Sequence, residues 1–374
     1  MKPRNELNTT VGQLLIIGFD GTEVSPQLLS LLTRLQPAGV ILFARNIISA
    51  EQTYRLLKDC QACVSTPLFT CVDMEGGKVD RFRNLNGGSP SAADVHATGD
   101  RKLFREHGKR IGEFCRALGF NTDFAPVLDL AFEASRNVMS SRAVSSDPRQ
   151  TAIYGGEFLS GLKDAGMLGC GKHFPGLGEG NLDSHHELPV IEKSLSRLWR
   201  EDIIPYRSLR RRMPFVLVSH AGYPSITRDN TPASLSKKII TGILRKRLDY
   251  TGLVVSDDLE MGAILKTLTI EQAAVEHLRA GGDLCLICHT EGAVVRAYEA
   301  VMKESERDRR FATLVATAEK RVARLKNKAL ASIAWKFPPP PGLARLDRLT
   351  RQAWDFSERI RLKKMLRERD QEQA

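Results

Sequence analysis

Several absences narrow the classes of protein that this chain of 374 residues can belong to. It has no run of about 18 apolar residues, which a membrane-spanning helix requires. Its opening stretch, MKPRNELNTTVGQLLIIGF, lacks the long apolar core and small-residue cleavage site of a secretory signal. The first apolar run is not followed by a GxGxxG turn, and no GK[ST] phosphate loop follows GLGEG, which disfavours the nucleotide-binding folds marked by these motifs. We therefore expect a cytoplasmic protein without a membrane span.

Cysteine is also scarce, and its spacing does not suit a metal site. There are seven cysteines, an odd number that argues against a secreted disulfide framework. Cys60 and Cys63 are predicted to lie one helical turn apart, without further ligands at zinc-site spacing. Cys285 and Cys288 are predicted to lie on a strand, where residues three apart face opposite sides. We expect both pairs to be buried free thiols and the protein to need no metal and no cofactor.

The net charge of +11 is unevenly distributed along the chain. From residue 303 to the end there are 19 Lys and Arg against 10 Asp and Glu, which leaves a charge of only +2 for residues 1–302. The body is therefore not predicted to bind nucleic acid. The C-terminal segment contains a stiff KFPPPP stretch and then a predicted helix with an apolar stripe through Leu346, Leu349, Trp354 and Phe356. This helix could pack on the body, remain a solvated tail, or bind an anionic surface.

Eight short apolar runs alternate with amphipathic stretches, which is the pattern of repeated βα units. The runs lie at residues 13–19, 39–44, 67–72, 120–127, 167–171, 215–220, 253–257 and 283–288. A doubly wound sheet would also fit the alternation, but it lacks its glycine-rich turn here. The sequence therefore predicts an α/β fold with a (β/α)₈ barrel over residues 1–330, followed by a Pro-rich linker and a basic helical extension over residues 331–374.

Polar and ionisable residues follow almost every predicted strand. Because a barrel places its chemistry at the C-terminal ends of its strands, these residues are expected to meet in one pocket. They are Asp20, Arg45, Asn46, Asp73, Asp129, Lys172, His173, Ser219, His220, Asp257, Asp258 and His289. So many strong hydrogen-bonding groups at one face predict an enzyme active site rather than an ordinary polar rim.

The stretch KHFPGLGEGNLDSHHELP, residues 172–189, leaves the fifth predicted strand as a glycine-rich loop. Such a loop could carry Asp183 and His185 over the pocket and away again. A carboxylate that accepts from one imidazole nitrogen would leave the other free to transfer a proton. From spacing alone, an ordinary surface loop in which both side chains bind nearby backbone is equally compatible.

Over residues 9–300 the sequence resembles glycoside hydrolase family 3, in particular its single-domain β-N-acetylhexosaminidases. The motifs that carry the resemblance are GVILFARN, VDMEGGKVDRFR, FAPVLDL, NVMSSRAVSSDP, KHFPG with DSH, and GLVVSDDLEMGAI. The resemblance implies a retaining exo-β-N-acetylglucosaminidase, acting on a small carbohydrate such as GlcNAc-1,6-anhydro-MurNAc muropeptide fragments in cell-wall recycling. We also expect a monomer.

The same resemblance implies roles for individual residues. Asp257 would be the nucleophile, with Asp258 as the alternative, and His185, assisted by Asp183, would be the general acid/base. The residues that would hold the sugar hydroxyls and the N-acetyl group are Asp73, Arg81, Arg142, Lys172 and His173. Asp257 is favoured over Asp258 because the family pattern places the catalytic carboxylate directly after a small residue, here Ser256.

Two departures from the family pattern keep other functions open. Leu177 stands where the family commonly has a histidine, and its side chain can neither donate nor accept a hydrogen bond; Lys78 stands where arginine is common. The alternatives are phosphorolysis of the same glycosides, since a histidine would not repel an incoming phosphate, another family 3 β-glycosidase, and a non-catalytic sugar-binding relative. A metal-dependent amidohydrolase is disfavoured, because it would need an HxH pair after the first strand and the chain reads GFDG there.

Overall fold

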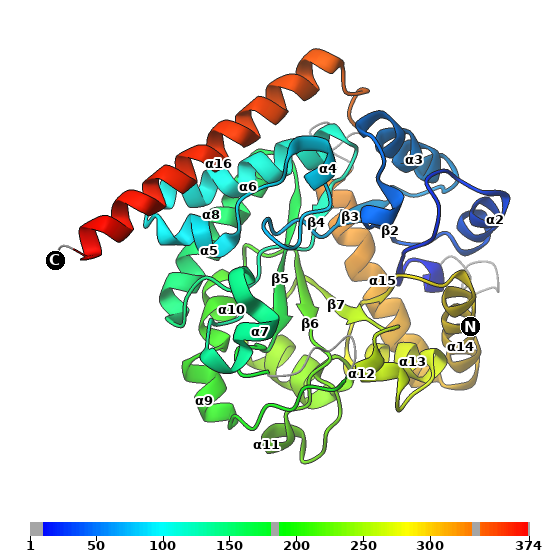
Figure 1. Cartoon of the computed structure of the whole chain (residues 1–374). Coiled ribbons are helices and arrows are strands. Elements are labelled where there is room, and N and C mark those ends of the chain that lie inside the picture. The colour runs from blue at the N-terminus through cyan, green and yellow to red at the C-terminus, as the bar shows by residue number, and fades with distance from the viewer. Residues whose placement is uncertain (1–9, 181–186, 331–336, 373–374) are drawn as a thin grey trace.

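The computed structural model describes residues 10–180, 187–330 and 337–372 of the chain. Its centre is a closed barrel of eight parallel strands in sequential order, β1 to β8, with helices around it (Figure 1). The strands are β1 (Leu15–Ile17), β2 (Gly39–Leu42), β3 (Phe69–Val72), β4 (Thr122–Asp123), β5 (Leu168–Phe174), β6 (Phe215–Val218), β7 (Leu253–Asp258) and β8 (Leu284–Ile287). The predicted (β/α)₈ fold is confirmed.

Each of the eight predicted apolar runs contains one barrel strand, but two strands extend further than the sequence indicated. β5 continues through Lys172 and His173, and β7 continues through Asp258. These residues were predicted to follow their strands, and that prediction was wrong. Because they lie on strands, their positions are fixed by the barrel. The predicted cysteine chemistry is largely confirmed, since all seven thiols are free; Cys63, however, is only partly buried.

Helices and short helical turns connect the strands. The α-helices are α2 (Pro26–Leu35), α3 (Ala50–Ala62), α4 (Arg83–Asn86), α5 (Ala92–Ala97), α6 (Arg101–Ala117), α7 (Arg136–Met139), α8 (Pro148–Asp164), α9 (Leu195–Arg200), α10 (Ile203–Leu209), α11 (Pro224–Thr227), α12 (Gly262–Leu265), α13 (Ile270–Ala280), α14 (Glu291–Arg307), α15 (Arg309–Ala329) and α16 (Leu343–Glu372). The 3₁₀ turns are η1 (Ala44–Asn46), η2 (Glu133–Ser135), η3 (Ser140–Arg142) and η4 (Ala233–Leu235), and η5 (Lys238–Arg247) is a π-helix.

Local sequence explains where many of these helices begin. Side-chain oxygens of Ser25 and Ser49 accept from backbone N–H groups in the first turns of α2 and α3, and Thr269 forms a capping box at α13. None of the helices in the described ranges is long and apolar enough to cross a membrane.

The C-terminal helix α16 docks on the barrel's outer helices, along α6 and beside α5 (Figure 1). Phe356 and Ile360 of α16 are buried in this contact. Several of its basic side chains pair with acids on the body, including Arg359 with Glu106 at 2.6 Å and Lys364 with Asp94 at 2.7 Å. Of the arrangements open from the sequence, the structure therefore shows packing on the body.

A lysine lies in the hydrophobic core beneath the barrel. Lys326 of α15 is only 4 % exposed, and its Nζ donates to Gln13 Oε1 at 2.7 Å and lies 5.2 Å from the ring centre of Phe69. No acidic side chain within the described residues pairs with it. Burial lowers the pKa of Lys326 from 10.5 to about 7. The folded protein therefore holds this proton less tightly than the unfolded chain does.

We expect Lys326→Met to raise the free energy of unfolding at pH 7 by about 2 kcal/mol, after the loss of the Gln13 hydrogen bond is deducted. Between pH 7 and 10.5 the unfolded chain binds one more proton than the folded protein. The free energy of unfolding of the wild type should therefore rise with pH in this range relative to that of the variant. Urea unfolding at pH 7, 8.5 and 10 measures the difference, with exposed Lys328→Met as the matched control. A pH-independent difference between wild type and Lys326→Met would contradict the prediction.

Candidate active site

A pocket of about 400 Å³ opens at the C-terminal ends of the barrel strands. Its walls come from β5, β6, β7 and β8 and from the segments that follow β2, β3, β4, β5, β7 and β8. Of the residues that the sequence singled out, it contains Asp73, Arg81, Arg142, Lys172, His173, Asp257, Asp258 and His289. The expectation that the strand-end groups meet in one pocket is confirmed for all of these except Arg81 and Arg142, which do not end strands.

Glu75 is the centre of a buried ion-pair network in this pocket. Its carboxylate, in a residue only 3 % exposed, accepts from Arg142 through two bonds of 2.7 and 2.9 Å and lies 2.6 Å from Lys172 Nζ. Burial by itself would raise the pKa of Glu75, but the two cations hold it well below its ordinary value. Glu75 therefore stays ionised and fixes the directions of both cationic side chains.

Asp73 belongs to the same network from the end of β3. It accepts from Lys172 at 2.9 Å, and its other oxygen lies 3.6 Å from an Arg81 nitrogen. Burial opposes ionisation, but Lys172 and Arg81 lower the pKa of Asp73 below the usual range. The Nε of Arg81 is buried and has no hydrogen-bond partner among the described residues. The Arg81 guanidinium, which lines the pocket, is thus held by a long ion pair to Asp73.

Beneath these groups lies a carboxyl group with the opposite tendency. Asp123 of β4 is fully buried; its Oδ1 accepts from the backbone N–H of Met74 at 2.9 Å, and its Oδ2 has no partner in the described part of the chain. Burial raises the pKa of Asp123 well above the ordinary value, and Asp73 and Glu75 add to that effect. Burial therefore favours the neutral form of Asp123, in contrast to the ionised carboxylates of Asp73 and Glu75.

His173 is oriented by a second buried carboxylate. Its Nδ1 lies 2.6 Å from Asp129 Oδ2, while its Nε2 lies 3.5 Å from an Arg142 nitrogen. The Lys172–His173 and Phe174–Pro175 peptide bonds are cis. Asp129 also accepts from the backbone N–H of Leu177 at 2.7 Å. The leucine that replaces the usual histidine is therefore held through its backbone, and its side chain is a buried part of the pocket wall.

The two aspartates at the end of β7 differ in their surroundings. Asp258 accepts from the backbone N–H groups of Glu260 and Cys288, and its second oxygen lies 3.2 Å from His289 Nε2. That contact raises the pKa of His289. Asp257, in contrast, has one contact within the described residues, in which its Oδ1 accepts from the N–H of Asp258 at 3.0 Å. Asp257 thus offers the pocket a carboxylate with free lone pairs.

His220 has a structural position rather than an exposed one. It is buried, with Nδ1 2.7 Å from Ser234 Oγ and Nε2 2.8 Å from the carbonyl oxygen of Asp258. Burial lowers the pKa of His220, although Asp257 opposes this shift. These hydrogen bonds indicate a near-core histidine rather than a side chain of the pocket wall.

Two of the predicted catalytic residues, Asp183 and His185, lie outside the described residues. Conversely, sequence reasoning assigned no role to Glu75, and it placed Asp129 among the strand-end groups without giving it a role of its own. A signal for Glu75 was present, because Asp73 and Glu75 are two apart in VDMEGG at the end of β3. The residues in the described ranges contain no cluster of three or more His, Cys, Asp or Glu side chains arranged to hold a metal ion.

Residues 6–325 match the model of the glycosyl hydrolase family 3 N-terminal domain. The chain belongs to glycoside hydrolase family 3. This enzyme is 33 % identical over 296 residues to a protein named beta-hexosaminidase from Idiomarina loihiensis, covering 78 % of this chain and 88 % of the relative. It is 38 % identical over 259 residues to a beta-hexosaminidase from Bordetella avium, covering 67 % of this chain and 73 % of that one.

A solved structure is similar over an even longer part of this family 3 enzyme. A family 3 beta-N-acetylglucosaminidase from Paenibacillus sp. str. FPU-7 has a TM-score of 0.85 and 32 % sequence identity, and the match covers 94 % of this chain and 68 % of that one. Residues 1–330 alone could not supply that coverage. Part of the C-terminal extension therefore has a counterpart in the Paenibacillus protein.

Proposed function

We propose that this family 3 glycoside hydrolase is a retaining exo-β-N-acetylglucosaminidase. The main support for the proposal is the carboxylate of Asp257, which accepts one hydrogen bond within the described residues and lies in a pocket that Arg81, Arg142 and Lys172 also line. A retaining glycosidase needs such a carboxylate on one side of the anomeric carbon. Cationic donors in the same pocket can bind sugar hydroxyls. The relatives named beta-hexosaminidase and beta-N-acetylglucosaminidase support an acetamido sugar as the substrate.

The proposed reaction has two steps. In the first, an oxygen of Asp257 bonds to the anomeric carbon while the glycosidic bond breaks and the leaving oxygen takes a proton from His185. In the second, water gives a proton to His185 and attacks the same carbon, which releases Asp257 and the sugar. Asp183 would accept from His185 and hold its tautomer. An imidazole suits this exchange near neutral pH because its unperturbed pKa is about 6.5.

The remaining polar groups of the pocket would bind the terminal sugar. Asp73 can accept from hydroxyls, His173 can accept from or donate to them, and the guanidinium of Arg81 lines the same pocket. Glu75 and Asp129 would not touch the sugar; they hold Arg142, Lys172 and His173 in fixed directions. We further propose that the natural substrate is a GlcNAc-containing muropeptide fragment in the cytoplasm, an extension that rests on the family resemblance.

The test is release of nitrophenol from 4-nitrophenyl β-N-acetylglucosaminide by the purified chain, compared with the matching β-glucoside, with and without phosphate. We expect hydrolysis of the acetamido sugar and little hydrolysis of the glucoside. For His185→Ala we expect kcat to fall by about 100-fold or more on glycosides whose leaving group is an ordinary sugar hydroxyl, which needs a proton to depart. A large acceleration by phosphate, with a sugar 1-phosphate as product, would replace hydrolysis by phosphorolysis. Inactivity towards both glycosides would contradict the proposal and favour a sugar-binding relative.

A further inference from the structure

The C-terminal helix α16 packs behind a loop that carries three charged side chains of the pocket. We call residues 73–91, between β3 and α5, the β3–α5 loop. Asp73, Glu75 and Arg81 extend from it into the pocket. Helix α16 passes along α6 and beside α4 and α5, on the outer side of the same region (Figure 1). A segment far from the barrel in sequence is thus in contact with the support of the sugar-binding groups.

The most direct contact is made by Trp354 of α16. Its indole Nε1–H donates to the backbone carbonyl of Asn86 at 2.7 Å. Asn86 is the last residue of α4, and Gly87 follows with a left-handed φ of 82°. A Cβ placed on Gly87 would lie 2.6 Å from the indole nitrogen. The indole therefore sits directly on the turn that ends α4, and glycine is required there by both conformation and space.

Phe356 makes a second, indirect contact with the loop. Its ring stacks on His107 of α6, with centroids 5.8 Å apart and planes at 22°. The Nε2 edge of the His107 ring lies close to the loop, since a Cβ on Gly76 would be 3.0 Å from His107 Nε2. Gly76 is next to Glu75, the centre of the ion-pair network. Helix α16 therefore contacts both ends of the segment from Glu75 to Asn86, once directly and once through His107.

Hydrogen bonds within the β3–α5 loop connect the Trp354 contact to Arg81. Asp80 Oδ1 accepts from the N–H of Phe82 at 2.9 Å, and its Oδ2 accepts from the N–H of Ser89 at 2.6 Å. The N–H of Gly77 in turn donates to the carbonyl of Ser89 at 3.0 Å. Arg81 lies between Asp80 and the start of α4. A shift of α4 would therefore move the Arg81 backbone with it.

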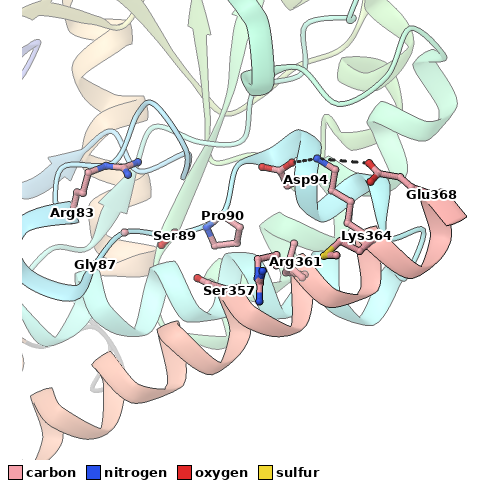
Figure 2. Close-up of a pocket in the computed structure, with 12 residues that line it drawn as sticks. Arg83, Gly87, Ser89, Pro90, Asp94, Ser357, Arg361, Lys364 and Glu368 are labelled. Atoms are coloured by element: carbon pink, nitrogen blue, oxygen red, sulfur yellow. Dashed lines mark hydrogen bonds and ion pairs between the residues drawn. The ribbon is translucent and has the colours of Figure 1, made fainter.

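A pocket of about 440 Å³ lies between the loop and α16 just beyond this contact (Figure 2). Gly87 to Pro90 line it on the loop side, and Ser357, Arg361 and Lys364 line it on the helix side. The ion pair from Lys364 to Asp94 lies at its far end, on α5 rather than on the loop. The pocket interrupts the packing beyond this point, and the hydrogen bond from the Trp354 indole is a direct restraint that α16 places on α4.

We infer that Trp354 is a positioning residue for sugar binding, which acts by fixing α4 and through it the Arg81 guanidinium. Among the described residues, the Arg81 guanidinium has a 3.6 Å contact to Asp73 and a 5.4 Å approach to the ring of Phe43, while its backbone N–H donates to Met74 Sδ at 3.1 Å. Its position therefore depends on where its backbone is held. Trp354 is 59 % exposed, so its burial contributes little to the core. The inference rests on the proposed role of Arg81 in binding the sugar.

The test compares Trp354→Phe, which keeps an aromatic ring but removes the indole N–H, with wild type and with Leu366→Ala. Leu366 is an exposed residue of the same helix and serves as the matched control. For Trp354→Phe we expect KM to rise about threefold to fivefold, the size of one lost hydrogen bond, with kcat within about twofold and the melting temperature nearly unchanged. Leu366→Ala should match wild type in all three.

A double-mutant cycle then shows whether the effect passes through Arg81. In an Arg81→Ala background, Trp354→Phe should have no further effect on kcat/KM, or on the dissociation constant for N-acetylglucosamine where turnover is too slow. An unchanged KM, or an equal effect in both backgrounds, would overturn the inference. Turnover by the wild type alone tests the proposed function. The ratio of KM between variant and wild type, which tests the inference, can be measured with any glycoside that the wild type hydrolyses.

Discussion

Asp257→Asn should reduce turnover of 4-nitrophenyl β-N-acetylglucosaminide by about a thousandfold or more, because an amide oxygen cannot form the covalent glycosyl-enzyme. The substitution keeps the shape of the side chain, and the oxygen that accepts from the N–H of Asp258 can be retained. We therefore expect KM and thermal stability to change little. Steady-state kinetics and a melting curve measure the three quantities.

Chemical rescue gives a sharper version of the same experiment. In Asp257→Ala, azide can occupy the space of the missing carboxylate and attack the anomeric carbon directly, so azide should restore turnover and yield a glycosyl azide of inverted configuration. Asp258→Ala is the matched comparison, since Asp258 is already bound by two backbone N–H groups and lies beside His289. Rescue of Asp258→Ala but not of Asp257→Ala would transfer the nucleophile to Asp258.

The second large effect is expected for Glu75→Gln. The glutamine is nearly the same size, but it removes the charge that Arg142 and Lys172 share in a site only 3 % exposed. Breaking a buried pair leaves uncompensated charges, which typically costs about 3–5 kcal/mol. We expect the free energy of unfolding to fall by about that amount at neutral pH, and kcat/KM to fall as both cations lose their fixed directions.

The pH dependence of this loss follows from the lowered pKa of Glu75. Its stabilising contribution is complete above the ordinary carboxyl pKa of 4.5 and is lost as pH falls through the folded value. The difference between wild type and variant in urea unfolding should therefore be constant from pH 5 to 8 and shrink in stronger acid. Glu157→Gln, which breaks the exposed pair with Arg101, is the control and should cost less than about 1 kcal/mol. Similar losses for the two variants would contradict the central role of Glu75.

Much of the barrel was predictable because each strand is a local apolar run. All eight runs became strands, and the residues that close them, such as Asp73 and Asp257, meet at one face because parallel strands end together. The ends of β5 and β7 were not predictable in this way. Lys172, His173 and Asp258 are polar and look like loop residues in sequence, but the barrel buries them next to partners from other strands.

The sequence by itself determined the barrel, the family resemblance and the set of charged residues that could serve as a sugar site. These follow from local periodicity and from motifs that are contiguous in the chain. Only the tertiary structure showed that Glu75 binds both Arg142 and Lys172, that Asp257 is free while Asp258 is bound, and that Trp354 contacts the turn after α4. The physical reason is the same in each case. Hydrogen bonds and ion pairs between residues tens to hundreds of positions apart depend on how the strands and helices pack, and no local pattern records that packing.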